Sequence, residues 1–303
     1  MKSIQTPRAS ARSGVLLVML AATAWGTVGV TTKAIYGMTV TNALSNGFFR
    51  LTLALPVLFL LGWLTLGRRL FRVGRKDLGW MLLMGGLTAI YQVCFFAAIV
   101  RTNVTIATLI TLCTAPVLVV MLSTWWTKEP LTRPVLLALC CALLGTGLLI
   151  TVKPDFTAQS SLVSGVLLAL GSALSYAVVT LISRTLAARC HPLQSIAIGF
   201  AFGAIVLLLA ALATGLVMRY SPLGWSLLIY LGLVPTALAY GLFFTGMRST
   251  SATVASTATL LEPLMAAALA WLLFGEHFNR NSLLGAGLLI GAMLLLYVNS
   301  RQK

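Results

Sequence analysis

Two charged side chains lie inside apolar stretches of this sequence. Glu262 occupies the middle of STATLLEPLMAAALAWLLFGEHFNR (256–280), among small and apolar residues, and Arg50 lies in NGFFRLTLALP (46–56). A carboxylate can bind an ammonium group or carry a proton, and a guanidinium can hold a carboxylate through paired hydrogen bonds. These residue types therefore predict recognition of a charged molecule, with proton transfer as a second use of Glu262.

Each of the two residues also has a structural interpretation. Glu262 could be a buried anchor that is hydrogen-bonded to another helix, and Arg50 could brace helix ends through backbone carbonyls or reach outward. Pro263 follows Glu262 and removes a backbone hydrogen bond to the carbonyl of Thr259. We expect this kink and the freed carbonyl to face a cavity, because broken helical backbone in an apolar environment is tolerated there.

Aromatic and amide side chains share two further helix faces. Their spacings are i, i+3, i+4, i+7 and i, i+4, i+7, in the sets Thr88, Tyr91, Gln92, Phe95 and Thr236, Tyr240, Phe243. Trp25 and Tyr176 lie at the centres of apolar segments. Rings with a polar tip suit a pocket that accepts apolar groups, although interhelical packing would use the same faces. The predicted substrate-binding residues are Trp25, Asn46, Arg50, Tyr91, Gln92, Tyr176, Tyr240 and Glu262.

The composition identifies the solvent around these residues. Of 303 residues, 59% are hydrophobic and 9% are charged, and the mean hydropathy is +0.99. Soluble domains carry about 25% charged residues, so a soluble surface could not be covered here. We predict an all-α integral membrane protein with ten spans, each close to the roughly 17–25 residues that a membrane helix needs. Their approximate ranges are 14–34, 43–65, 78–100, 103–125, 134–151, 164–183, 195–217, 225–247, 252–274 and 282–299.

The basic residues predict the orientation of the chain in the membrane. Of the 21 lysines and arginines, one side of the predicted topology holds a single residue per connection, namely Lys33, Arg101, Lys153, Arg219 and Arg280. The others lie on the side of the two termini, except Arg50 within the second span. The positive-inside rule therefore places both termini in the cytoplasm. The net charge of +16 then reflects topology and contact with anionic lipid, and we expect no nucleic-acid partner.

The two halves of the chain resemble each other. Residues 14–35 align with 165–186, where GVLL opens both and Trp25 falls on Tyr176. Residues 101–133 align without gaps with 248–280. Each half holds five spans, so the second copy enters from the opposite side. Inverted repeats of this kind are typical of transporters, in which two halves enclose a site near the membrane midplane. Two structural duplicates without a transport role are the alternative.

The predicted domains follow from this repeat. Repeat 1 covers residues 14–151 and repeat 2 covers 164–299. They are joined by the loop 152–163 and flanked by cytoplasmic tails at 1–13 and 300–303.

The ends of the fourth and ninth spans carry related motifs. Pro116 precedes Glu129 with a P-x(12)-E spacing, and Glu262–Pro263 precedes Glu276 in the same way, within a segment that contains WLLFGE. With these motifs, the chain resembles the EamA-type exporters of the drug/metabolite transporter superfamily, and within them the YddG-like amino-acid exporters. The resemblance implies a ten-helix basket with a central cavity, efflux of small metabolites, and a bacterial inner (plasma) membrane. Ala115 stands opposite Glu262, so a mechanism with two mirrored carboxylates is not expected.

We therefore predict a secondary transporter that exports small amphipathic metabolites, in particular neutral or aromatic amino acids, by alternating access. A multidrug or other metabolite efflux carrier is the alternative, and proton coupling through Glu262 is an open question. The sequence lacks a GxxxxGK[ST] loop for ATP and the HExxH and GxSxG motifs of hydrolases, so an enzyme is not expected. A channel or receptor fits the inverted repeat less well. The five cysteines and two histidines show no metal-ligand spacing, and we expect neither a metal nor a cofactor.

Two further features concern motion and assembly. Pro116 and Pro263 occupy matching positions in the repeats and are candidate gating hinges, with static kinks as the alternative. The patterns GLLIG (287–291) and CALLG (141–145) favour close helix packing. A homodimer through these helices is a second interpretation.

Overall fold

The computed structural model describes residues 11–102, 104–126, 131–149, 159–274 and 280–299. The predicted tails and the predicted loop 152–163 lie largely outside these ranges, as do Glu129 and Glu276. The described residues form helices and contain no strand. They are α1 (Ala11–Met38), α2 (Ala43–Leu66), η1 (Gly67–Phe71), α3 (Arg75–Arg101), α4 (Val104–Trp126), α5 (Arg133–Leu149), α6 (Gln159–Arg189), α7 (Pro192–Thr214), α8 (Pro222–Gly232), η2 (Leu233–Leu238), α9 (Ala239–Met247), α10 (Ala252–Ala258), α11 (Leu261–Phe274) and α12 (Arg280–Asn299).

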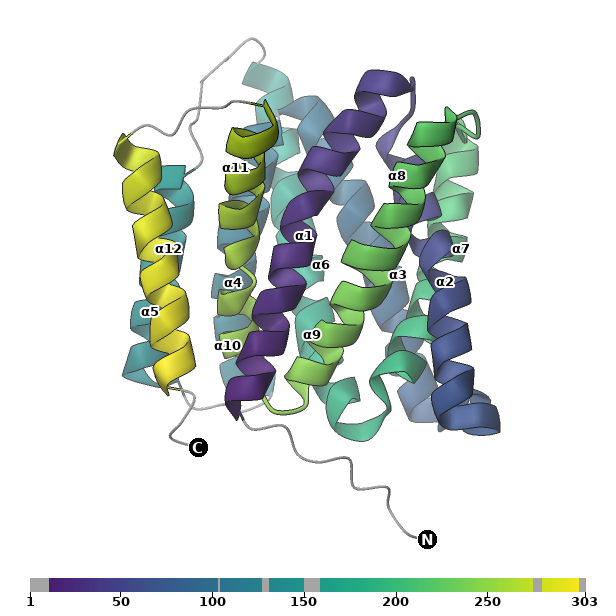
Figure 1. The fold of residues 1–303 in the computed structure, drawn as a ribbon, viewed down its shortest axis with the longest axis horizontal. Coiled ribbons are helices and arrows are strands. Elements are labelled where there is room, and N and C mark those ends of the chain that lie inside the picture. The colour runs from purple at the N-terminus through teal and green to yellow at the C-terminus, as the bar shows by residue number, and fades with distance from the viewer. Residues whose placement is uncertain (1–10, 103, 127–130, 150–158, 275–279, 300–303) are drawn as a thin grey trace, which may run out of the picture.

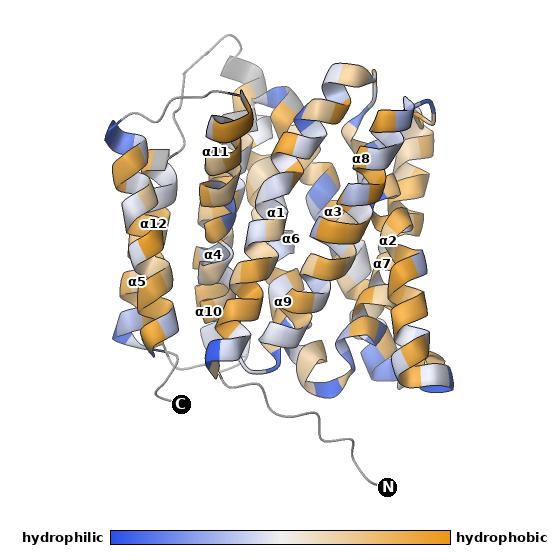
Figure 2. Cartoon of the chain, in the orientation of Figure 1, coloured by the Kyte–Doolittle hydropathy of each residue, from blue (hydrophilic) through white to orange (hydrophobic). Residues whose placement is uncertain are grey.

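The prediction of a helical membrane protein is confirmed. Among the described residues, nine helices or helix pairs are long and apolar enough to cross a membrane, and α5 is a shorter apolar helix. Figure 2 shows apolar residues along the lengths of the helices and hydrophilic residues gathered toward their ends. The bundle therefore has the distribution of polarity that a bilayer requires.

The helices of the two halves run in opposite directions. Figure 1 shows α1 starting, and α12 ending, at the same edge of the bundle, whereas α6 starts at the other edge. The two halves also interleave, because α3 packs against α6 and α7, α2 against α7, and α1 against α9 and α11. The repeats therefore share one core, and a cavity at its centre has walls from both.

Glycine allows the closest of these helix crossings. A Cβ atom on Gly85 of α3 would overlap the carbonyl oxygen of Gly199 on α7, and one on Gly203 would lie 2.8 Å from the carbonyl oxygen of Gly85. Without a side chain at these positions the two backbones can touch, as small residues commonly allow in membrane proteins. This contact fixes α3 of the first repeat against α7 of the second.

Polar contacts tie α2 and α7 at both ends. At the edge where α7 begins, the Gln194 amide donates hydrogen bonds to the carbonyls of Arg69 (3.0 Å) and Leu70 (2.9 Å). At the opposite edge, the Tyr220 hydroxyl donates to the Asn46 side chain of α2 (3.2 Å). In each case an amide near the start of one helix contacts the connection that follows the other helix. Since α2 and α7 are equivalent helices of the two inverted repeats, the two contacts occupy equivalent positions at opposite edges of the bundle.

Two of the predicted spans are interrupted. The eighth contains the π-helical segment η2, which includes Pro235, and the ninth breaks between α10 and α11. Pro263 lies in the first turn of α11, where the missing N–H matters little. The Thr259 carbonyl accepts the Glu262 N–H at 2.9 Å, so our expectation that it is left free is wrong. By contrast, Pro116 lies within the continuous helix α4.

The peripheral helices α5 and α12 pack mainly on each other. A Cβ atom on Gly145 would lie 2.7 Å from the carbonyl oxygen of Gly285, so the α5 pattern serves a contact within the chain. Gly287 and Gly291 have no neighbouring atoms within the range of a Cβ contact among the described residues. Homodimerisation through α12 stays a prediction.

We predict that Gly85→Ala destabilises the protein by about 1–3 kcal/mol, because the new methyl group overlaps backbone that cannot rotate away. Thermal unfolding in detergent would measure this as a lower melting temperature. Gly86→Ala is the matched control, since its Cβ would meet Phe202 at an ordinary 3.5 Å. Equal melting temperatures for the two variants would contradict the packing described above.

Candidate functional site

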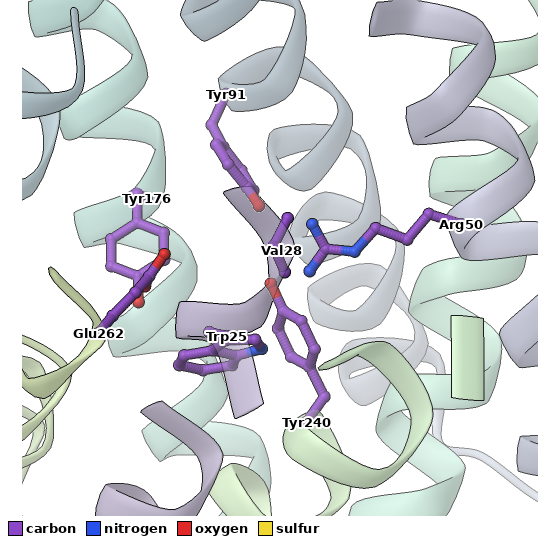
Figure 3. A pocket seen from close by; sticks show the side chains of 7 residues that line it. All are labelled: Trp25, Val28, Arg50, Tyr91, Tyr176, Tyr240 and Glu262. Carbon is purple, nitrogen blue, oxygen red and sulfur yellow. The ribbon is translucent and has the colours of Figure 1, made fainter. Parts of the chain in front are cut away.

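A cavity of about 70 Å³ lies where the two repeats meet. Its walls come from α1, α2 and α3 of the first repeat and from α6, α9 and α11 of the second. Figure 3 shows the lining side chains converging from these helices. They are Trp25, Val28, Arg50, Tyr91, Tyr176, Tyr240 and Glu262.

The two charged residues face the cavity from opposite sides. Figure 3 shows Arg50 reaching in from one side and Glu262 from the other, with aromatic rings between them. No ion pair joins them in the part of the chain that the structure describes. In a low-dielectric site, two separated opposite charges create a field across the space between them. A ligand with a positive and a negative end can be oriented by this field.

Arg50 is held from one edge of its guanidinium. Its Nε atom donates to the Thr236 hydroxyl at 2.7 Å, and Nη2 donates to the Pro235 carbonyl at 3.4 Å. A guanidinium carries five N–H donors. The remaining donors of Arg50 have no protein acceptor among the described residues, and Figure 3 shows the two terminal nitrogens directed into the space near Tyr91 and Tyr240. Arg50 therefore braces the neighbouring helix through one edge of its guanidinium, and the other edge faces the cavity.

Glu262 lies in the first turn of α11, directly after the break in the ninth span. It lies beside Tyr176 in Figure 3. Its carboxylate makes no hydrogen bond and no ion pair with the described part of the chain, so the hydrogen-bonded anchor that the sequence allowed has no partner here. A carboxylate inside a membrane protein normally needs a proton, a partner or water. Each of these can reach it through the cavity.

Aromatic rings make up most of the wall. The Trp25 ring contacts Tyr240 and Phe243, with centroid distances of 4.9 and 5.3 Å, and Tyr91 lies edge-on to Tyr176 at 5.8 Å. Trp25 is only 5% exposed, and its indole N–H has no hydrogen-bond partner in the described structure. A buried donor without an acceptor costs free energy. A ligand acceptor in the cavity would satisfy it.

The structure brings six of the eight predicted site residues to this cavity. The other two, Asn46 and Gln92, are buried outside its wall. Asn46 accepts the hydrogen bond from Tyr220, whereas the Gln92 amide donates to the Thr88 carbonyl at 3.4 Å and its oxygen lies against Gly47. The side-chain oxygens of both residues thus lie where α2 contacts its neighbours, whereas the Asn46 Nδ2 atom has no hydrogen-bond partner in the described structure.

Sequence reasoning missed one lining residue, Val28. It follows Trp25 by three residues on α1, so the same helix face carries both. That spacing could have identified it, although valine itself carries no chemical signal in an apolar helix.

Comparison with known proteins identifies the family. The sequence pattern of the EamA-like transporter family matches residues 12–151 and again residues 163–298. The chain belongs to the EamA-like transporter family. It is therefore a multi-pass membrane transporter and not an enzyme.

Several transporters are similar to this chain over nearly their whole length. The uncharacterized transporter YwfM of Bacillus subtilis is 31% identical over 95% of each chain. An uncharacterized transporter of Archaeoglobus fulgidus is 29% identical over 94% of this chain and 97% of its own. The uncharacterized inner membrane transporter YicL of Salmonella typhimurium is 28% identical over 97% of this chain and 98% of its own.

The fold is shared with a solved crystal structure. It has a TM-score of 0.83 and covers 96% of this chain and 98% of that one, at 19% identity. At this identity the likeness concerns the arrangement of helices and not the substrate.

The cavity predicts a pattern of thiol accessibility in this transporter. With the five native cysteines replaced by alanine, we expect Val28→Cys to react with a small methanethiosulfonate reagent, because Val28 lines the cavity. Ala21→Cys, on the same helix but 0% exposed, should not react, and Val40→Cys, at a position 97% exposed, should react fastest. Mass spectrometry would count the adducts. An unreactive Val28→Cys beside a reactive Val40→Cys would contradict the cavity.

Proposed function

We propose that this transporter exports small zwitterionic metabolites of the amino-acid class by alternating access. The observation that carries the proposal is the placement of Arg50 and Glu262 on opposite walls of one small cavity. Their separation suits a molecule with a carboxylate at one end and an ammonium group at the other.

Each wall has a defined use in this proposal. The terminal nitrogens of Arg50 bind the substrate carboxylate through charge-assisted hydrogen bonds, and the Glu262 carboxylate binds the ammonium group. The Trp25 indole N–H donates to a substrate oxygen. The faces of Tyr91, Tyr176 and Tyr240 contact the apolar side chain, and aromatic faces also attract an ammonium group.

The size of the cavity supports small substrates over large drugs. Its volume of about 70 Å³ is well below the roughly 300–1,000 Å³ of pockets for drug-sized ligands. A multidrug carrier, the alternative function, would need a much larger separation of the six helices. Neutral amino acids fit the polar ends and the aromatic walls with less rearrangement.

The shared walls support alternating access. Because three helices of each repeat line the cavity, a movement of some of these helices against the others would open it first to one face and then to the other. In the proposed orientation both termini are cytoplasmic, as the distribution of arginine and lysine favours. The substrate gradient drives export. A proton on Glu262 competes with the substrate ammonium group and thereby couples proton movement to substrate export.

The Arg50 proposal can be tested with purified protein in proteoliposomes. We expect counterflow of labelled neutral amino acids in the unmodified protein. Arg50→Gln should raise the half-saturation concentration roughly 10- to 100-fold, because a hydrogen bond to a charged group is worth about 1.5–3 kcal/mol. The effect should be absent for the decarboxylated amine of the same amino acid.

Arg219→Gln, on the connection between α7 and α8 and outside the central cavity, is the matched control and should transport normally. If Arg50→Gln weakened the amine and the amino acid equally, carboxylate recognition by Arg50 would be wrong.

Proton coupling gives a second test in the same vesicles. Glu262→Gln cannot carry a proton on this side chain. We expect it to retain exchange at saturating substrate but to lose any acceleration of net efflux by an imposed pH gradient. Flux would be measured with and without the gradient. A Glu262→Gln protein that responds to the gradient like the unmodified protein would remove Glu262 from the coupling step and leave substrate binding by Arg50 intact.

A further inference from the structure

Arg50 of the first repeat is oriented by a broken helix of the second. Its Nε atom donates to the hydroxyl of Thr236 at 2.7 Å, and its Nη2 atom donates to the carbonyl of Pro235 at 3.4 Å. Both acceptors belong to η2 (Leu233–Leu238), the π-helical segment between α8 and α9. Among the residues that the structure describes, no other protein atom accepts a hydrogen bond from this guanidinium.

The sequence explains why this segment can accept from an arginine. Pro235 has no N–H, so the carbonyl of Leu231, four residues before it, loses its usual helical donor. The Thr236 hydroxyl supplies the missing hydrogen bond by donating to that carbonyl at 2.8 Å. In a π-turn, hydrogen bonds join residues five apart and not four apart, so residue 236 lies over residue 231. The wider turn accommodates the proline ring without breaking the span. π-Turns are frequent at functional sites.

The direction of each hydrogen bond is then determined. A threonine hydroxyl has a single proton and two lone pairs. Since the proton of Thr236 is donated to Leu231, its oxygen can only accept from Arg50. Thr236 is 0% exposed, so bulk water does not compete for this lone pair. Because Pro235 leaves the Leu231 carbonyl free to accept the Thr236 proton, the Thr236 oxygen is available only as an acceptor for Arg50.

This arrangement selects one way of binding a carboxylate. A guanidinium can offer a carboxylate either its Nε and one terminal nitrogen or its two terminal nitrogens. Thr236 occupies Nε and the Pro235 carbonyl takes one N–H of Nη2, which leaves the outer N–H groups of the two terminal nitrogens. Figure 3 shows these nitrogens directed into the cavity between Tyr91 and Tyr240. The side chain is held so that its planar end faces the site.

We propose that Thr236, set by the π-turn at Pro235, is a positioning residue that presents Arg50 end-on to the substrate carboxylate and so determines the preference for carboxylate-bearing substrates. The proposal rests on the function proposed above, in which Arg50 binds that carboxylate. It adds a residue that does not itself line the cavity.

The test compares each substrate with its decarboxylated amine. Thr236→Val removes the hydroxyl and keeps the shape of the side chain. We expect the ratio of half-saturation concentrations, amine over amino acid, to fall roughly tenfold, as expected when an interaction with a charged group is weakened. The maximal rate for the amine should stay unchanged. Thr236→Ser restores the hydroxyl and should restore the ratio.

Thr245→Val is the matched control. Thr245 lies in α9, and its hydroxyl donates to the Gly241 carbonyl of its own helix at 2.7 Å. The variant removes an equivalent intrahelical hydrogen bond without touching Arg50, so the ratio should not change. A fall as large as that of Thr236→Val would assign the effect to helix stability and overturn the proposal.

Pro235→Ala is a second route if Thr236→Val does not fold. It returns a backbone N–H to the segment, which competes with Thr236 for the Leu231 carbonyl and favours an ordinary α-turn. We expect the ratio to fall here as well, with the hydroxyl still present. An unchanged ratio in a folded Pro235→Ala protein would overturn the role of the π-turn.

The outcomes separate this proposal from the function on which it rests. If Arg50→Gln abolishes carboxylate preference and folded Thr236→Val retains it, Arg50 binds the carboxylate without help from Thr236, and only the positioning role is wrong. If Arg50→Gln itself retains the preference, the proposed function fails.

Discussion

The central constraint on this structure is the cost of holding a guanidinium and a carboxylate inside a bundle surrounded by lipid. An ionised side chain at that depth needs hydrogen-bond partners or water. Unbroken helices cannot supply backbone acceptors, because their carbonyls are used within the helix. The chain meets the need by interrupting two helices of the second repeat beside the cavity. The π-turn at Pro235 provides acceptors for Arg50, and the break before Leu261 brings Glu262 to the wall.

The fold has the symmetry of an inverted repeat, but its chemistry does not. In the first repeat α3 and α4 are continuous helices, and Ala115 of α4 aligns with Glu262. Arg50, the basic residue that lines the cavity, comes from the first repeat, whereas both interruptions lie in the second. A symmetric scaffold can move equivalently in two directions. An asymmetric site can orient a polar substrate in one way. The residues that give the scaffold its symmetry are therefore different from those that orient the substrate.

Features that depend on one-dimensional pattern could be predicted from the sequence. The helical membrane fold follows from ten apolar segments and their length, and Arg50 and Glu262 stand out because a charge in an apolar run is expensive. Trp25 and Tyr176 were identifiable from their depth. Features that depend on neighbours leave a weaker trace in the sequence. Val28 lacks a chemical signal, and only its spacing from Trp25 places it on the same helix face.

Two amide residues show the opposite error, in which a polar side chain predicted for the site lies outside it. Asn46 and Gln92 carry a polar signal, but their hydrogen bonds are made outside the cavity wall. The break near Thr259 was expected at the right helix, yet its carbonyl is occupied by the Glu262 N–H, because a nearby donor satisfies a freed acceptor at low cost. The π-turn was not anticipated, since a proline in an apolar span predicts a kink without specifying its geometry.

The distribution of contacts bears on which helices could move if the cavity opens alternately. α2 and α7 belong to different repeats, yet Gln194 ties them at one edge and Asn46 at the other. Separating this pair would break hydrogen bonds at both ends, whereas α1 meets α9 and α11 mainly through apolar side chains and rings. Apolar contacts in lipid can slide without leaving donors unsatisfied. The α2–α7 pair is therefore the part of the bundle best suited to stay fixed, and because Arg50 is on α2, the carboxylate-binding end of the site would stay fixed with it while Glu262 on α11 moves.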